Sequence, residues 1–459
     1  MFDRRQTMES AASPPPLPDA VNYRHSKAGL VLALIVIAAC AVFVVRVQTM
    51  ERDEPTAEVR PNRMLELLAR YAVGTKALIQ STGQPTAELN DAMLRDVGTI
   101  SRTDEDALRI LMLKGWMADQ PPDEAKMAAL AQKNEGLKAD VEVLGRLSSI
   151  QDLAADKDWK RFFKRHGWMA QLARAQTLEA KDPARQAVVQ QGMGTAMVLI
   201  SGMMLGMLAA VGGLVLMIWG IRRWRGGKLR LTLGRSSRGH GGVLIEGFAI
   251  YLLLFLLLPW LLRQLPVPLP RWVAYGPALV ALILGMLWPL LRGMQRLLWR
   301  ETLGLHRGAG WFKEMGAGVL GWLAALPLLV LGMIAASWIT KLTGQFPSHP
   351  IVEVFAGNGW AKLGAVVLAV VWAPVSEELM FRGLLFPGLS AWLRWLLGML
   401  LAAFVFAVIH PQGWAGVPAI MALAATFSFL RMWRQSLIAP MTAHALNNGI
   451  MCAMLLLLW

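Results

Sequence analysis

Apolar residues are grouped along this chain in long runs, separated by shorter polar stretches that are rich in arginine and lysine. A helix needs about 20 mostly apolar residues to cross the hydrocarbon core of a membrane. The runs therefore predict an all-α protein, a polytopic membrane helical bundle of about nine spans. The expected spans are 28–45, 193–220, 243–262, 272–291, 316–339, 362–394, 395–410, 416–430 and 437–459.

One part of the chain, residues 46–191, differs from the rest because its composition is that of a soluble protein. Apolar positions recur there at helical spacing, for example at Leu65, Leu68 and Tyr71, and Gly/Pro-containing turns separate the periodic segments. The pattern predicts an inserted soluble helical domain. Since this stretch has no clustered set of His, Cys and acidic residues, we expect it to pack on the membrane core or to bind a protein partner.

Lysine and arginine are concentrated before residue 28 and in two loops, 222–238 and 292–313. Short loops that are rich in these residues remain on the cytoplasmic side of a membrane. We therefore expect a multi-pass protein of the cell inner (plasma) membrane. The predicted parts are a disordered cytoplasmic tail at 1–27, a membrane anchor helix at 28–45, an extracytoplasmic helical domain at 46–191 and membrane helices at 193–345.

The composition supports this assignment, because 55% of the 459 residues are hydrophobic, which is too many for an ordinary soluble protein. The net charge of +15 lies mostly in the loops, where it meets anionic lipid, and we expect no nucleic-acid partner. The two cysteines offer neither a disulfide framework nor a Cys-based metal site. Cys40 follows a short Ile-Ala-Ala sequence like a lipoprotein cleavage site, but the apolar run continues to Val45, which favours an uncleaved anchor.

Charged residues interrupt one of the C-terminal apolar runs. Glu377 and Glu378 are adjacent, and Arg382 lies one helical turn after Glu378 on the same face. A charged side chain at bilayer depth is costly, and such residues usually mark a functional site. One acid would suffice for a structural ion pair with Arg382, so the second carboxylate indicates chemistry.

Two histidines, His410 and His444, also interrupt apolar runs, whereas the other histidines lie in polar or loop-like sequence. Asn448 follows His444 by four residues, so both side chains lie on one face of a helix. A carboxylate, two imidazoles and an amide among apolar helices are suited to proton transfer and oxyanion stabilisation.

At these positions the chain resembles the CAAX-protease and bacteriocin-processing (CPBP or Abi) family of intramembrane glutamic endopeptidases, and it is similar to type II CAAX prenyl endopeptidases. The family's three motifs are Glu-Glu-x-x-x-Arg, Phe-x-x-x-His and His-x-x-x-Asn, and all three occur here in order. The resemblance implies a catalytic membrane domain at 361–459. The matching residues are Glu377, Glu378, Arg382, Phe406, His410, His444 and Asn448.

The resemblance also implies roles for these residues. Glu377 would be the general base that activates water, His410 would share that water, and His444 with Asn448 would stabilise the oxyanion. The expected activity is hydrolysis of a peptide bond in a membrane-associated protein or a lipidated peptide, within the lipid bilayer and without a cofactor.

The remaining motif residues would support the site. Glu378 would pair with Arg382 or orient the other groups, and Phe406 would pack in the cavity wall.

Two alternatives remain at the level of sequence. The first is a zinc-dependent intramembrane metalloprotease with Glu377, His410 and His444 as ligands, although the His-Glu-x-x-His spacing of helical zinc sites is absent. The second is a non-enzymatic transporter or immunity-type binding protein that uses the same polar cluster. Against a transporter, the chain shows no inverted repeat of short, broken helices.

Overall fold

The computed structural model describes most of the chain, and all regular secondary structure in the described residues is helical. This confirms the all-α fold class. Expectations for residues 1–26, 51–62 and 265–275, which include most of the predicted cytoplasmic tail, lie outside the described residues. The described residues are 27–50, 63–86, 91, 93–94, 103–150, 152–233, 240–264, 276–343, 351–355 and 358–458.

Seven helices in the described part of the chain are long and apolar enough to cross a membrane, and two shorter apolar helices accompany them. They correspond in order to the predicted spans. The long ones are α1 (Lys27–Met50), α9 (Pro183–Arg225), α10 (Gly241–Arg263), α13 (Trp311–Thr343), a composite helix over 359–392, α19 (Gly413–Arg434) and α20 (Ile438–Leu458). The shorter ones are α11 (Gly276–Leu291) and α18 (Trp395–Val408).

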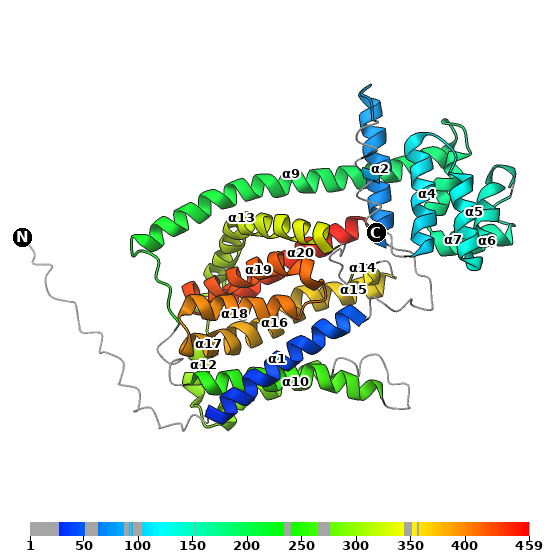
Figure 1. Ribbon diagram of the computed structural model, residues 1–459. Helices are drawn as coiled ribbons and strands as arrows, with labels where there is room; N and C mark the ends of the chain where they lie inside the picture. The colour runs from blue at the N-terminus through cyan, green and yellow to red at the C-terminus, as the bar shows by residue number, and fades with distance from the viewer. Residues whose placement is uncertain are drawn as a thin grey trace, which may run out of the picture.

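The membrane helices pack in layers (Figure 1). Helix α13 packs on α9, α19 and α20, while α10 packs on α1, α11 and the end of the composite helix. The composite helix, α18, α19 and α20 therefore lie in the middle of the bundle, between α13 and α10. Two short helices, α12 (Arg296–Leu303) and α14 (Ile351–Phe355), lie in the connections.

The inserted helical region has a hydrophobic core of its own, formed by residues from Leu65 to Val188. Its helices are α2 (Arg63–Ser81), α4 (Asp104–Ala118), α5 (Glu124–Lys133), α6 (Lys138–Gly145), α7 (Lys157–His166) and α8 (Trp168–Gln176). Two of these helices, α2 and α8, pack on α9.

Helix α9 joins this region to the membrane bundle without a break. The sequence predicts a boundary near residue 192, where the composition changes, but the helix continues from Pro183 to Arg225. A change in composition alone does not end a helix, and a helical glycine costs only about 1 kcal/mol relative to alanine. Gly192 instead allows close packing on α2, where a Cβ on Gly74 would lie 2.0 Å from the Gly192 carbonyl oxygen.

The composite helix contains two π-helical turns, and each is followed closely by a proline. Proline has no N–H, and its ring crowds the carbonyl four residues earlier, so the helix must widen there. The N–H of Ala373 donates to Leu368 O just before Pro374, and the N–H of Phe386 donates to Phe381 O just before Pro387. The successive segments are α15 (Gly359–Val367), η5 (Leu368–Trp372), α16 (Ala373–Glu378), η6 (Leu379–Leu385) and α17 (Phe386–Trp392).

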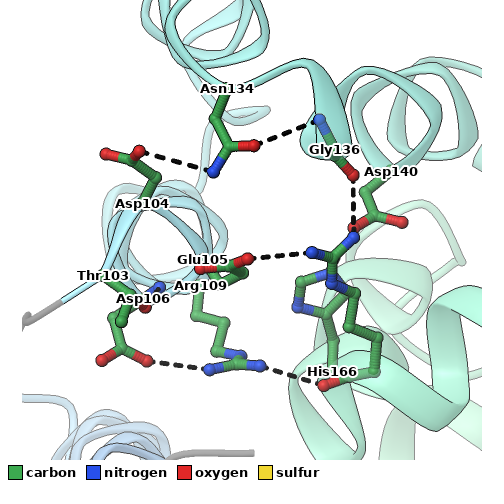
Figure 2. Close-up of polar contacts among 10 residues, drawn as sticks. Thr103, Asp104, Glu105, Asp106, Arg109, Asn134, Gly136, Asp140 and His166 are labelled. Carbon is green, nitrogen blue, oxygen red and sulfur yellow. Dashed lines mark hydrogen bonds and ion pairs between the residues drawn. The ribbon is translucent and has the colours of Figure 1, made fainter. Parts of the chain in front are cut away.

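A buried polar network joins α4, α6 and α7 in the inserted region (Figure 2). Arg165 donates to Asp140 Oδ2 at 2.9 Å and to Glu105 Oε1 at 2.8 Å. His166 Nε2 lies 3.1 Å from the same Asp140 oxygen, and Arg109 donates to the Arg165 carbonyl at 2.9 Å. Because both Asp140 and His166 are fully buried, protonation of this network should affect folding of the region.

Burial lowers the pKa of His166, because desolvation disfavours the imidazolium; Asp140 opposes this effect and Arg109 adds to it. The unfolded chain then binds more protons than the folded one, so the free energy of unfolding falls as the pH drops below about 6.5. We expect hydrogen exchange in α7 of the full chain, corrected for intrinsic rates, to be faster at about pH 5.5 than at about pH 7.5. His166→Gln should remove most of this pH dependence, and an unchanged dependence in the variant would contradict the assignment.

Candidate active site

The predicted polar residues meet in the middle of the membrane bundle. Glu377 and Glu378 lie at the end of α16, between the two π-helical turns. His410 follows the end of α18, and His444 lies on α20. π-Helical turns are frequent at functional sites because they change the direction of side chains without breaking the helix.

Glu378 is the centre of a buried ion network. Its Oε1 atom accepts hydrogen bonds from Arg382 Nη1 and from His444 Nδ1, both at 2.9 Å. Arg382 also donates from Nη2 to the Ala424 carbonyl of α19 at 2.8 Å. The side chains of Glu378 and Arg382 are 0% and 1% exposed, so this pair is fully removed from solvent and joins the composite helix to α19 and α20.

Glu377, in contrast, is 25% exposed and makes no close contact with Arg382. Its Oε2 atom lies 3.8 Å from His410 Nε2 and 3.8 Å from His444 Nε2. Both distances are too long for a direct hydrogen bond, and Oε2 is buried without a hydrogen-bond partner. The carboxylate and the two imidazoles therefore surround a common point.

The other ring nitrogens determine which atoms face that point. His410 Nδ1 lies 2.5 Å from the Phe406 carbonyl oxygen, which can only accept, so this nitrogen carries a proton. His444 Nδ1 similarly donates to Glu378. In the neutral rings both Nε2 atoms are consequently acceptors, and they face the Glu377 carboxylate oxygen, which is also an acceptor. A group that donates hydrogens fits between them.

Aromatic rings enclose the network. The Arg382 guanidinium carbon lies 4.7 Å from the ring centroid of Phe406 and 5.1 Å from that of Phe427. Phe406 also contacts His410 at 4.3 Å between ring centroids, and Phe427 stacks on His444 at 5.0 Å. The aromatic faces stabilise the cation and restrict both imidazoles. Sequence reasoning missed Phe427, because it lies outside the three motifs in an ordinary apolar run.

Asn448 lies one helical turn after His444 on α20, as its spacing predicts. Its Nδ2 atom donates to the Ala369 carbonyl in η5 at 2.8 Å. Its neighbour Asn447, which the motifs do not include, donates to Asn448 Oδ1 at 3.3 Å. Asn448 is thus attached to η5, the π-helical segment that precedes the two glutamates on the composite helix.

In the part of the chain that the structure describes, no group of three or more His, Cys, Asp and Glu side chains is arranged to hold a metal ion. A zinc ligand set of Glu377, His410 and His444 would need each donor atom about 2.0–2.2 Å from one point.

Residues 359–450 match the family model described as Type II CAAX prenyl endopeptidase Rce1-like. The matched segment contains every residue of the site described above. Comparison of the chain with curated proteins and with solved structures gave no match. The match covers the C-terminal membrane region, and that region is similar to the type II CAAX prenyl endopeptidase Rce1-like family.

Proposed function

We propose that the protein is an intramembrane endopeptidase that hydrolyses a peptide bond in a membrane-associated protein or lipidated peptide. One observation carries the proposal, the equal 3.8 Å spacing from Glu377 Oε2 to His410 Nε2 and to His444 Nε2. Separations of this size between acceptor atoms suit a bridging water. The family match supports the reaction class.

In the proposed reaction, Glu377 and His410 accept hydrogen bonds from one water molecule. The water oxygen attacks the carbonyl carbon of the scissile bond while one of its protons moves to Glu377 Oε2. Collapse of the tetrahedral intermediate breaks the C–N bond, and the same proton passes to the leaving nitrogen. The products are a carboxylic acid and an amine, and Glu377 returns to its starting form.

The developing oxyanion needs donors on the opposite side of the carbonyl carbon. As an imidazolium, His444 would donate from Nε2 to the oxyanion and would no longer accept from the water, because its Nδ1 proton is bonded to Glu378. Glu377 and Glu378 flank that imidazolium and balance its charge. Asn448 supplies the other donor. One N–H of its NH₂ group bonds the Ala369 carbonyl, and the remaining N–H can donate to the oxyanion.

The inserted helical region would contribute a surface for a protein partner or substrate outside the membrane. Two neighbouring hollows of about 380 and 470 Å³ on this region share Trp116, Asp119 and Arg185. In Figure 1 the region projects beyond one end of the bundle. Such a surface suits a polypeptide, since polar side chains such as Gln120, Gln176 and Gln186 lie among apolar ones in its lining.

The activity can be tested with full-length protein reconstituted in liposomes and a library of membrane-anchored peptides, half of them lipidated. We expect mass spectrometry to detect new peptide termini with the wild type and none with Glu377→Gln. If neither protein cleaves any peptide, while both keep the same thermal stability, a non-enzymatic role for the polar cluster would replace the proposal.

We also expect cleavage to survive extensive treatment of the purified protein with a strong zinc chelator. The proposed base is a carboxylate, so no step depends on a metal-bound water. A zinc protease treated in parallel serves as the positive control and should lose its activity. If chelation abolishes cleavage and added zinc restores it, Glu377, His410 and His444 would have to be reassigned as ligands.

A further inference from the structure

A line of polar contacts reaches Asn448 from a helix outside the family-matched segment. The indole nitrogen of Trp322 on α13 donates to Asn447 Oδ1 at 3.4 Å. Asn447 Nδ2 donates to Asn448 Oδ1 at 3.3 Å, and Asn448 Nδ2 donates to the Ala369 carbonyl at 2.8 Å. Three separate segments, α13, α20 and η5, therefore meet through two side-chain amides.

The groups at the two ends of this series of hydrogen bonds, the Trp322 indole and the Ala369 carbonyl, determine the orientation of both amides. An indole N–H can only donate, so Asn447 must present its oxygen to Trp322 and its NH₂ group to Asn448. Asn448 then accepts through its oxygen and directs its own NH₂ group away from Asn447. At the other end the Ala369 carbonyl can only accept, which requires the same orientation of Asn448. Rotating either amide by 180° would oppose two acceptors or two donors.

Close helix packing keeps the indole at a constant distance from α20. Gly318 lies one helical turn before Trp322 on α13, and a Cβ at Gly318 would lie 2.5 Å from the Ala439 carbonyl oxygen and 2.8 Å from Thr442 Cβ. Trp322 itself packs against a cluster that includes Phe427 and Ala443. The separation of α13 and α20 is thus set by backbone contact and not by the long side chains.

We propose that Trp322 and Asn447 are positioning residues that hold the Asn448 NH₂ group toward the reacting carbonyl. This inference rests on the proposed function, in which Asn448 donates to the oxyanion. One hydrogen of that group bonds Ala369, and the relay fixes the direction of the other. Without the relay, the bond to Ala369 alone holds the Asn448 amide, so its NH₂ group is directed less strictly toward the oxyanion.

The test uses a peptide from the liposome library that the wild type cleaves. Trp322→Phe removes the indole N–H together with part of the ring, and we expect kcat to fall about 3- to 10-fold with KM unchanged. Asn447→Asp still accepts from Trp322 but cannot donate to Asn448, so the decrease in kcat should be larger. Trp338→Phe is the matched control on α13, because Trp338 is 69% exposed and lies outside the line of contacts.

The decisive comparison repeats both substitutions in an Asn448→Ala background. If the residues act through Asn448, neither substitution should lower kcat further in that background. An equal loss with and without Asn448, or wild-type kcat in both single variants, would overturn the relay. If the relay fails but Glu377→Gln still abolishes cleavage in the same assay, the proposed function stands. A wild type that cleaves no peptide would overturn both the relay and the proposed function.

Discussion

Replacement of Glu377 by glutamine is expected to lower the cleavage rate by about 10²–10⁴-fold, the usual effect of losing a general base. Glutamine keeps the size of the side chain but cannot accept the proton of the attacking water. The loss should appear in kcat, because the proton moves only in the transition state. Cleavage rates of the purified, reconstituted protein give the measurement.

The fold of this variant should be unaffected, since Glu377 is partly exposed and its Oε2 atom makes no hydrogen bond that would be lost. Glu301→Gln is a suitable control, because it makes the same chemical change at an exposed position on α12. A Glu377→Gln variant that cleaves at the rate of the control would refute the glutamate mechanism.

Replacement of Arg382 by leucine is expected to destabilise the protein by about 3–5 kcal/mol, because it leaves a buried carboxylate without its cation. Glu378 is 0% exposed, and among the described residues His444 would be its remaining hydrogen-bonding side chain. The leucine would also lose the contacts of the guanidinium with Phe406 and Phe427. Denaturant unfolding of the full chain in detergent measures the change.

Two further variants test whether the loss of stability in Arg382→Leu comes from the unpaired charge of Glu378. Adding Glu378→Gln to Arg382→Leu removes the uncompensated charge, so the double variant should be more stable than Arg382→Leu alone. Lys126→Met breaks an exposed ion pair with Asp123 in the inserted region and should leave the stability unchanged. Equal stability of Arg382→Leu and wild type would show that the network around Glu378 is not needed for folding.

Local patterns in the sequence were sufficient to predict the membrane helices and the polar residues of the site. Spans follow from the length of the apolar runs, and the cost of burying charge singles out Glu377, Glu378 and Arg382. Helical spacing also places His444 and Asn448 on one face of α20. These inferences need only short stretches of chain.

What could not be predicted depends on packing between distant segments. Phe427 stacks on His444, and Trp322 reaches Asn447 across more than a hundred residues of sequence, because α13 and α19 fold against α20. Neither contact produces a periodic pattern of apolar residues in the sequence. The π-helical turns arise from prolines inside a continuous helix, where a break is the usual expectation.

The continuity of α9 through residue 192 has a related cause. Apolar composition begins there, but α9 continues through it, because Gly192 serves close packing on Gly74 and does not end the helix. The inserted region and the membrane bundle are therefore joined by one continuous helix.

The most direct test of the central claim compares membrane proteins from cells that carry the wild type with those from cells that carry Glu377→Gln at equal abundance. Mass spectrometry of protein termini reports every membrane protein that loses a segment. The account predicts at least one membrane-associated protein that is shortened in wild-type cells and keeps its terminal segment in Glu377→Gln cells. Identical termini in the two sets of membranes, with the wild-type protein folded and present, would contradict it.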